Sequence, residues 1–255
     1  MQTGERPTLR KAGRRRMEGR MVFYVVFAQD DELSGAGAGY FQQQQRFEEL
    51  SGEPCLLVRY KRVNPRLLAE LAPTAVVMSG FGRSFETFDR KHLVGVNDAV
   101  KRATCPILGI CGSHQLNAMF HTLDIRKVTQ FEDLPMRKLR PGEPDLYPAY
   151  HPGYFKETGF HHIRTVQDDP LFRGFEETLF CLESHYCEVK TLPREFTVLA
   201  STDECRVQAY RHRNKPLYGV QFHPEGYTDA YPDGKTLLEN FFRLAGARRF
   251  RGKAR

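Results

Sequence analysis

Residues 106–115 read Pro-Ile-Leu-Gly-Ile-Cys-Gly-Ser-His-Gln, and this stretch decides the fold. Its apolar half predicts a buried strand, and the glycine after Cys111 predicts a sharp turn into a helix. Such a turn lifts the cysteine out of the sheet and places it at a helix N-terminus, where the dipole favours an anion. A cysteine that follows a strand is by itself more often a small core residue. Cys111 is therefore a candidate nucleophile that requires a partner.

A second stretch supplies candidate partners. Residues 218–225 read Tyr-Gly-Val-Gln-Phe-His-Pro-Glu. His223 and Glu225 stand two residues apart, so both can point to one side of an extended backbone. A thiol needs a base to become a good nucleophile, and the base needs an orienting group. Cys111, His223 and Glu225 are therefore predicted to form a catalytic triad.

Apolar runs and helical patterns alternate through the first half of the chain. This order predicts an α/β fold with a doubly wound, mostly parallel central sheet and flanking helices. Its active site should lie at the carboxyl ends of the strands, where Cys111 and the turn 80–82 both fall. We expect strands at 22–28, 55–60, 75–79 and 107–110, and helices at 40–51, 65–71, 89–103 and 113–121.

The second half has a β-rich pattern. A final helix at 234–245 should pack its apolar stripe on the sheet, and the five prolines of residues 131–155 predict an ordered loop or lid. A passive insertion remains the alternative for that loop. The glycines of residues 35–39 predict a loop. They resemble a dinucleotide-binding fingerprint, but Tyr40 occupies its third glycine position, which disfavours dinucleotide binding. We expect strands near 161–166, 179–183, 187–191, 196–201, 206–211 and 217–222.

Charge divides the chain into three parts. Residues 1–20 carry seven Lys or Arg and two Glu, and residues 247–255 carry five Lys or Arg and no acid. Each end therefore has a charge of +5, which leaves −3 for the body of a chain whose net charge is +7. We predict a disordered basic leader at 1–20, one domain at 21–246 and a basic tail at 247–255. Nucleic acid is an unlikely partner of so mildly acidic a body.

Other features exclude whole classes of protein. There is no apolar run near the ~20 residues that span a bilayer, and no signal peptide pattern at the start. The six cysteines lack the spacing of a disulfide scaffold, which favours the cytoplasm. Cys181, His185 and Cys187 lie close in sequence, but no Cys-x-x-Cys pair accompanies them. We therefore expect no metal and no cofactor.

The two motifs in this order resemble the class I glutamine amidotransferases. Gly109, Cys111 and Gln115 match that family's Gly-x-Cys-x-Gly-x-Gln motif, and residues 221–225 match its Gln-Phe-His-Pro-Glu motif. The resemblance runs from about residue 22 to about residue 245 and implies the family's fold. It extends to residues 76–84, 182–189, 198–203 and 215–219.

The resemblance implies a role for each matched residue. Cys111 would attack a carboxamide to form a γ-glutamyl thioester and release ammonia. His223 would act as the base, and Glu225 would orient it. The backbone around Gly80, Phe81 and Gly112 would form the oxyanion hole, and the pocket for glutamine would be lined by Gln115, Ser184, His185 and Tyr186.

Two residues depart from the family pattern. Ser113 stands where a glycine is usual, and its small size predicts only slight strain. Phe81 stands at the second glycine of the oxyanion turn, where a bulky side chain could restrict the backbone or narrow the pocket. The identity of the oxyanion donor therefore stays open because of Phe81.

The resemblance favours an enzyme that hydrolyses glutamine, with ammonia passed to a separate synthetase subunit. The sequence near Ser184 and Gln221 is most similar to the ammonia-donating branch, which includes the amidotransferase domains of GMP synthetase and anthranilate synthase. A stand-alone γ-glutamyl hydrolase is one alternative. A pseudoenzyme with a regulatory or assembly role is the other, which the intact triad disfavours and Phe81 weakly favours.

Overall fold

The computed structural model describes residues 20–129 and 131–247. The predicted leader and tail lie outside these residues, apart from Arg20 and Ala247. One nine-stranded sheet runs through the described chain in the order β2-β1-β3-β4-β9-β8-β7-β5-β6. Its parallel half comprises β1 (Val22–Val26), β2 (Cys55–Arg59), β3 (Ala75–Met78), β4 (Ile107–Ile110) and β9 (Leu217–Val220). Its antiparallel half comprises β5 (Glu157–Thr165), β6 (Thr178–His185), β7 (Phe196–Ser201) and β8 (Ala209–His212).

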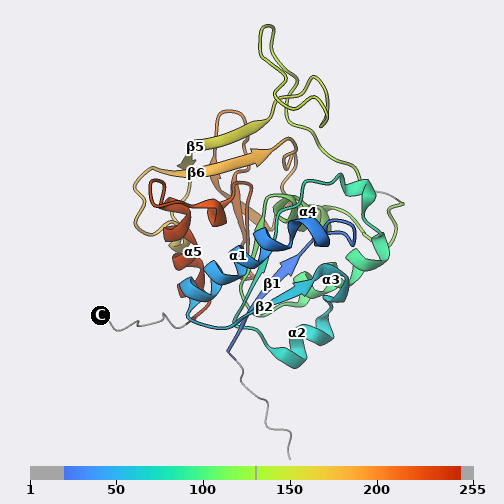
Figure 1. The fold of residues 1–255 in the computed structure, drawn as a ribbon, viewed down its shortest axis with the longest axis vertical. Helices are drawn as coiled ribbons and strands as arrows, with labels where there is room; N and C mark the ends of the chain where they lie inside the picture. The colour runs from blue at the N-terminus through green and yellow to red at the C-terminus, as the bar shows by residue number, and fades with distance from the viewer. Residues whose placement is uncertain (1–19, 130, 248–255) are drawn as a thin grey trace, which may run out of the picture.

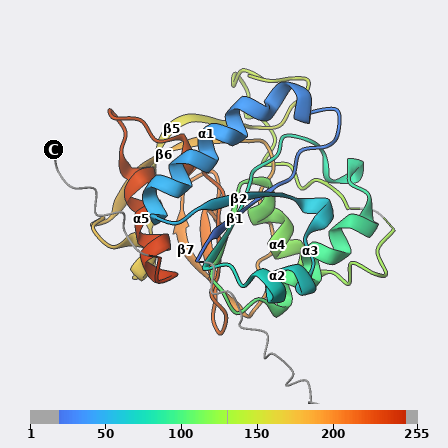
Figure 2. The ribbon, with the colours of Figure 1, turned by 60° about the horizontal axis from the view of Figure 1, so that its bottom comes forward.

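Helices cover both faces of the parallel half. Figure 2 shows α1 and α5 on one side of β1 and β2, and α2, α3 and α4 on the other. None of the described helices combines the length and apolarity needed to cross a membrane. The helices are α1 (Leu33–Ser51), α2 (Pro65–Leu71), α3 (Arg90–Arg102), α4 (Gly112–Thr122) and α5 (Asp233–Leu244). Short 3₁₀ turns are η1 (Tyr60–Arg62), η2 (Phe85–Thr87), η3 (Pro170–Phe172) and η4 (Pro224–Gly226).

The two helical layers explain why β1 is apolar throughout. Alternate residues of a strand point to opposite faces, so a strand covered on both sides buries every side chain. Tyr24 packs with Phe47 of α1, while Phe23 joins the cluster that contains Leu93 of α3. Phe47 in turn meets Phe242 of α5, with ring centroids 6.1 Å apart. The predicted doubly wound fold with its β-rich second half is confirmed.

Two predicted elements were wrong. Helix α1 begins at Leu33 and continues through residues 35–39, where the glycines predicted a loop. Glycine costs only about 1 kcal/mol per residue in a helix, which the burial of Phe47 and Leu50 later in α1 offsets. Residues 187–191 do not form a strand, because β6 is the sheet edge and Cys187 instead makes an isolated bridge to Pro135.

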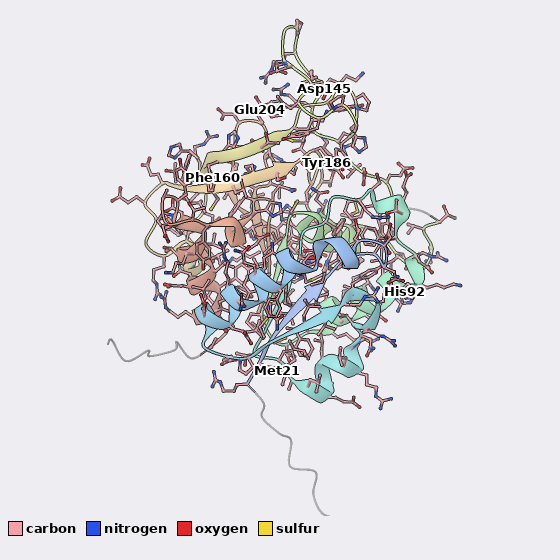
Figure 3. All side chains as sticks on the ribbon, viewed as in Figure 1. Met21, His92, Asp145, Phe160, Tyr186 and Glu204 are labelled. Carbon is pink, nitrogen blue, oxygen red and sulfur yellow. The ribbon has the colours of Figure 1, made fainter. Side chains whose placement is uncertain are left out.

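The proline-rich segment 131–155 is an ordered loop, as predicted. It projects beyond β5 in yellow-green at the top of Figure 1, and Figure 3 labels Asp145 within it. The Arg137 guanidinium pairs with both Glu143 and Glu204, and so ties the loop to the chain beyond β7. The N–H of Met136 donates to the Tyr186 carbonyl at 2.9 Å. The loop is therefore fixed at the end of β6.

Candidate active site

Cys111 occupies a strained turn between β4 and α4. Its backbone has φ 50° and ψ −112°, a conformation that residues with a side chain rarely adopt. The Ser113 hydroxyl supports the turn, because its oxygen accepts from the Ile110 N–H at 2.9 Å and it donates to the Met78 carbonyl at 2.8 Å. Ser113 has no positive φ. The φ of Ser113 shows no more than the slight strain expected there, and the strained residue is Cys111.

Gly80, at the end of β3, brings the two halves of the triad together. A Cβ on Gly80 would lie 3.1 Å from the Cys111 Cβ and 3.0 Å from the His223 Cε1. The thiol-bearing turn and the imidazole therefore border the same glycine, although they are far apart in sequence. Any side chain at this position would push them apart.

His223 is positioned by its backbone and by Glu225. Its N–H donates to the Leu182 carbonyl at 2.7 Å, and its ring Nδ1 lies 2.8 Å from the Glu225 Oε1. Its Nε2 is buried, and among the described residues it has no hydrogen-bond partner. Burial opposes a charged imidazole, but the charges of Glu225 and Cys111 outweigh it and raise the pKa of His223 well above its usual value. The site thus favours a protonated imidazole beside Cys111.

Gln221 links the two motifs, and sequence reasoning gave it no role. Its Nε2 lies 3.7 Å from the Cys111 Sγ, while its Oε1 accepts from the Gln115 side chain at 3.0 Å. Gln115 also donates to the Cys187 carbonyl at 2.8 Å. The Cys111 thiol in turn faces the Ser184 carbonyl at 3.7 Å. The signal was present in the sequence, because Gln221 is the first residue of the motif 221–225 that also contains His223.

A cavity of about 470 Å³ opens beside Cys111. Gly80, His223 and Glu225 are not among the residues that line it. Its wall also includes residues that the sequence did not single out, and three of these lie in the 131–155 loop, which therefore borders the cavity. The predicted site residues in the wall are Phe81, Cys111, Gly112, Gln115, Ser184, His185 and Tyr186. The residues that the sequence did not single out include Phe85, Asp133, Tyr147, Tyr150, Lys156, Thr158 and Gly159.

Phe81 does not distort the oxyanion turn in the way its size suggested. Its backbone φ is not positive. Its ring packs against Phe85 and Phe88, with centroids 5.3 and 4.8 Å away. The same ring lies over Gly112, where a Cβ would stand 2.8 Å from three of its atoms. Phe81 therefore fixes the turn against the start of α4.

His185 and Tyr186, two of the predicted pocket residues, differ in the contacts that they make. Both ring nitrogens of His185 are occupied, Nδ1 by the Cys187 carbonyl at 2.9 Å and Nε2 by Glu157 at 2.9 Å. Burial opposes its charge, but Glu157 and Glu183 raise the pKa of His185 to about 10. His185 is thus a buried cation that supports the wall. Tyr186 reaches across the cavity and donates to the Gly82 carbonyl at 2.5 Å.

Comparisons with known proteins show which family the chain belongs to. A family model described as glutamine amidotransferase class-I matches residues 43–245. The chain is 33% identical over 175 residues to the glutamine-hydrolyzing GMP synthase subunit of Pyrococcus abyssi, covering 68% of this chain and 77% of that one. It is 35% identical over 184 residues to the subunit of the same name from Methanopyrus kandleri, covering 72% and 81%.

Two solved structures share the fold. A putative GMP synthase subunit from Thermoplasma acidophilum superposes with a TM-score of 0.65 at 22% identity, covering 89% of this chain and 94% of that one. The glutaminase domain of Trypanosoma brucei CTPS, solved with bound acivicin, gives 0.60 at 15% identity, covering 91% and 98%. The motifs, the family match and the archaeal relatives agree, and the chain belongs to the class-I glutamine amidotransferase family.

Proposed function

We propose that this amidotransferase hydrolyses the side-chain amide of glutamine at Cys111. The thiolate attacks the amide carbonyl carbon, and His223 protonates the departing nitrogen, which leaves as ammonia. A γ-glutamyl thioester remains on Cys111. Water, deprotonated by His223, then cleaves the thioester to glutamate and restores the thiol. Glu225 holds the imidazole ring in the orientation that both steps require.

The close approach of Gly80 to both Cys111 and His223 carries this proposal. It supports a thiol and a base that share one reaction centre. The backbone N–H of Gly112 and the turn that contains Gly80 and Phe81 are the proposed oxyanion donors. Gln115, Ser184 and Tyr186 are proposed to contact the amino acid end of glutamine, and His185 to hold that wall in place.

The ammonia is proposed to pass to a separate synthetase subunit. Support comes from the two archaeal relatives, whose names describe a glutamine-hydrolysing subunit of GMP synthase. We assign the amidotransferase domain to residues 21–246. A cytoplasmic location is proposed because all six cysteines are free in the structure.

A coupled assay for glutamate and ammonia tests the function. Cys111→Ala should lower glutamine hydrolysis by roughly 10⁴-fold or more, whereas Cys105→Ala, a change at a cysteine outside the cavity, should leave it unchanged. Acivicin should add one covalent adduct, on the peptide that contains Cys111. An adduct elsewhere would reject Cys111 as the nucleophile.

The same assay separates the alternatives. A γ-glutamyl hydrolase would turn over γ-glutamyl dipeptides faster than glutamine, with no response to a synthetase. An ammonia donor should prefer glutamine, and a cognate synthetase should stimulate it. Absence of turnover with every substrate, with and without a synthetase, would leave the pseudoenzyme.

A further inference from the structure

Three potential metal ligands meet beside the cavity, and the proposed reaction uses none of them. Asp133 lies near the start of the 131–155 loop, His151 near its end, and Cys187 just beyond β6. One ligand atom from each residue lies within 4.8 Å of the other two. The Asp133 Oδ2 and the His151 Nε2 are 3.1 Å apart. Carboxylate, imidazole and thiol thus converge from three separate segments.

This donor set matches the chemistry of zinc. Zinc binds Asp oxygen, His nitrogen and Cys sulfur at about 2.0–2.3 Å in tetrahedral geometry. Ligand atoms around such an ion lie about 3.3–3.7 Å from one another. The separation of 3.1 Å between Asp133 and His151 is close to this range, and the Cys187 Sγ lies within 4.8 Å of both ligand atoms.

Contacts outside the cluster hold its members in place. The Asp133 Oδ1 accepts from the Phe85 N–H at 2.8 Å, which orients the carboxylate and leaves Oδ2 toward His151. Cys187 is fixed by its bridge to Pro135. His151 has φ 46°, an uncommon backbone conformation for a residue with a side chain. Partners of this kind are what keep metal ligands in register.

Access and charge also favour a cation at this place. Asp133 and Cys187 both line the cavity, which gives an ion a path from solvent. A dication held between Asp133 and Cys187 would lie against the Asp133 carboxylate, whose negative charge favours a cation there. A second group of possible ligands, Glu157, His185 and Cys205, is fully buried. Its imidazole is already bonded at both nitrogens, so it is the weaker candidate.

We propose that Asp133, His151 and Cys187 bind a zinc ion at the rim of the cavity. Three protein ligands leave a fourth coordination position for water or for a carboxylate that enters the cavity. The ion fastens the 131–155 loop to the chain after β6. The sequence analysis weighed Cys187 as a ligand only together with Cys181 and His185 and expected no metal, because the segments that hold Asp133 and His151 meet Cys187 only once the loop has folded.

Equilibrium dialysis of the full chain against ZnCl₂, with metal quantified by mass spectrometry, tests the site. The wild type should bind one equivalent at micromolar free zinc. Asp133→Asn, His151→Asn and Cys187→Ser should each weaken binding about tenfold or more. Asparagine at 133 keeps an acceptor for the Phe85 N–H, and asparagine at 151 tolerates the positive φ. These two variants therefore test ligation with the local fold preserved.

Two matched variants exclude other thiols. Cys111→Ala removes the thiol of the triad from the same cavity, and Cys205→Ala disrupts the second group; both should still bind one equivalent. Substitution with Co²⁺ should give a thiolate-to-metal absorption band that is absent from Cys187→Ser. The proposal is overturned if the wild type fails to bind zinc, if the three ligand variants bind as the wild type does, or if Cys111→Ala abolishes binding. None of these readouts depends on glutamine hydrolysis.

Discussion

The ring of Phe81 fills the space that a side chain on Gly112 would need. A Cβ added at Gly112 would stand 2.8 Å from three atoms of that ring. Since Phe27, Phe85 and Phe88 surround the ring, it cannot move aside easily. The oxyanion turn and the first residue of α4 are therefore interlocked.

This interlock predicts that a substitution at Phe81 partly suppresses the effect of a substitution at Gly112. Gly112→Ala should lower kcat about tenfold or more, because the new methyl group displaces the proposed oxyanion donor. Adding Phe81→Ala should recover part of that loss, which a double-mutant cycle would measure as coupling. Gly82→Ala is the control, since a Cβ at Gly82 meets nothing within 4 Å. Additive effects at Gly112 and Phe81 would contradict the interlock.

The strained backbone at Cys111 should lower the free energy of unfolding. Its positive φ costs about 1–3 kcal/mol for a residue with a Cβ, and glycine adopts that conformation without the steric cost. Cys111→Gly should therefore be more stable than Cys111→Ala by roughly 1 kcal/mol in urea unfolding. At Cys105, whose φ is not positive, the order should reverse. The same order at both positions would show that Cys111 is not strained.

His223 and Glu225 should differ in importance. His223→Ala removes the proton acceptor, whereas Glu225→Gln keeps a group that can hydrogen-bond the Nδ1 of the ring. The glutamate change should cost about 10- to 100-fold less in kcat, as found for the third member of other triads. Circular dichroism would establish that both variants fold. Equal losses would mean that Glu225 does more than orient the ring.

The 131–155 loop should determine the affinity for glutamine rather than the rate of its hydrolysis. Tyr147 and Tyr150 line the cavity, and Tyr150 stacks on Tyr186 with centroids 5.1 Å apart. The double variant Tyr147→Ala/Tyr150→Ala should raise KM several-fold with little change in kcat. Leu146→Ala is the matched control, because Leu146 and Tyr147 are both 53% exposed but only Tyr147 lines the cavity. Steady-state kinetics that show a change in kcat alone would contradict this role.

Buried His185 predicts how stability depends on pH. Its pKa is about 10 in the folded chain and about 6.5 when unfolded. The folded state therefore binds the extra proton, and this stabilisation is complete below about pH 6.5 and lost as the pH rises toward 10. The slope should approach about 1.4 kcal/mol per pH unit. Urea unfolding across this range should show a shallower decline for His185→Gln, and an unchanged slope would reject the buried cation.

The sequence predicted an element well where a continuous apolar run is compatible only with a buried strand. Residues 107–110 form a continuous apolar run, and β4 has those bounds. Helix α1 was predicted too short, because the low propensity of residues 35–39 is a local signal that packing further along the helix overrides. Residues 187–191 have a strand-like pattern but lie beyond the sheet edge, and no local pattern reveals where a sheet stops.

The same distinction holds for the site. Cys111, His223 and Glu225 lie in compact motifs whose residue types reveal their chemistry. Asp133 and Tyr147 line the cavity because the folded 131–155 loop borders it. Nothing in their local sequence indicates a pocket, since the loop's course depends on distant contacts such as that between Arg137 and Glu204.

The contact between Arg46 and the Glu225 carbonyl has a consequence for synthesis of the chain. The Arg46 side chain, on α1, donates to that carbonyl and lies 4.4 Å over the Tyr227 ring. A helix from the first fifth of the chain thus braces a turn from its last fifth. Because the ribosome delivers the N-terminus first, Cys111 emerges before His223 and Glu225, its proposed base and orienting group. Helix α1 can therefore brace the turn that carries Glu225 only after translation has passed Tyr227.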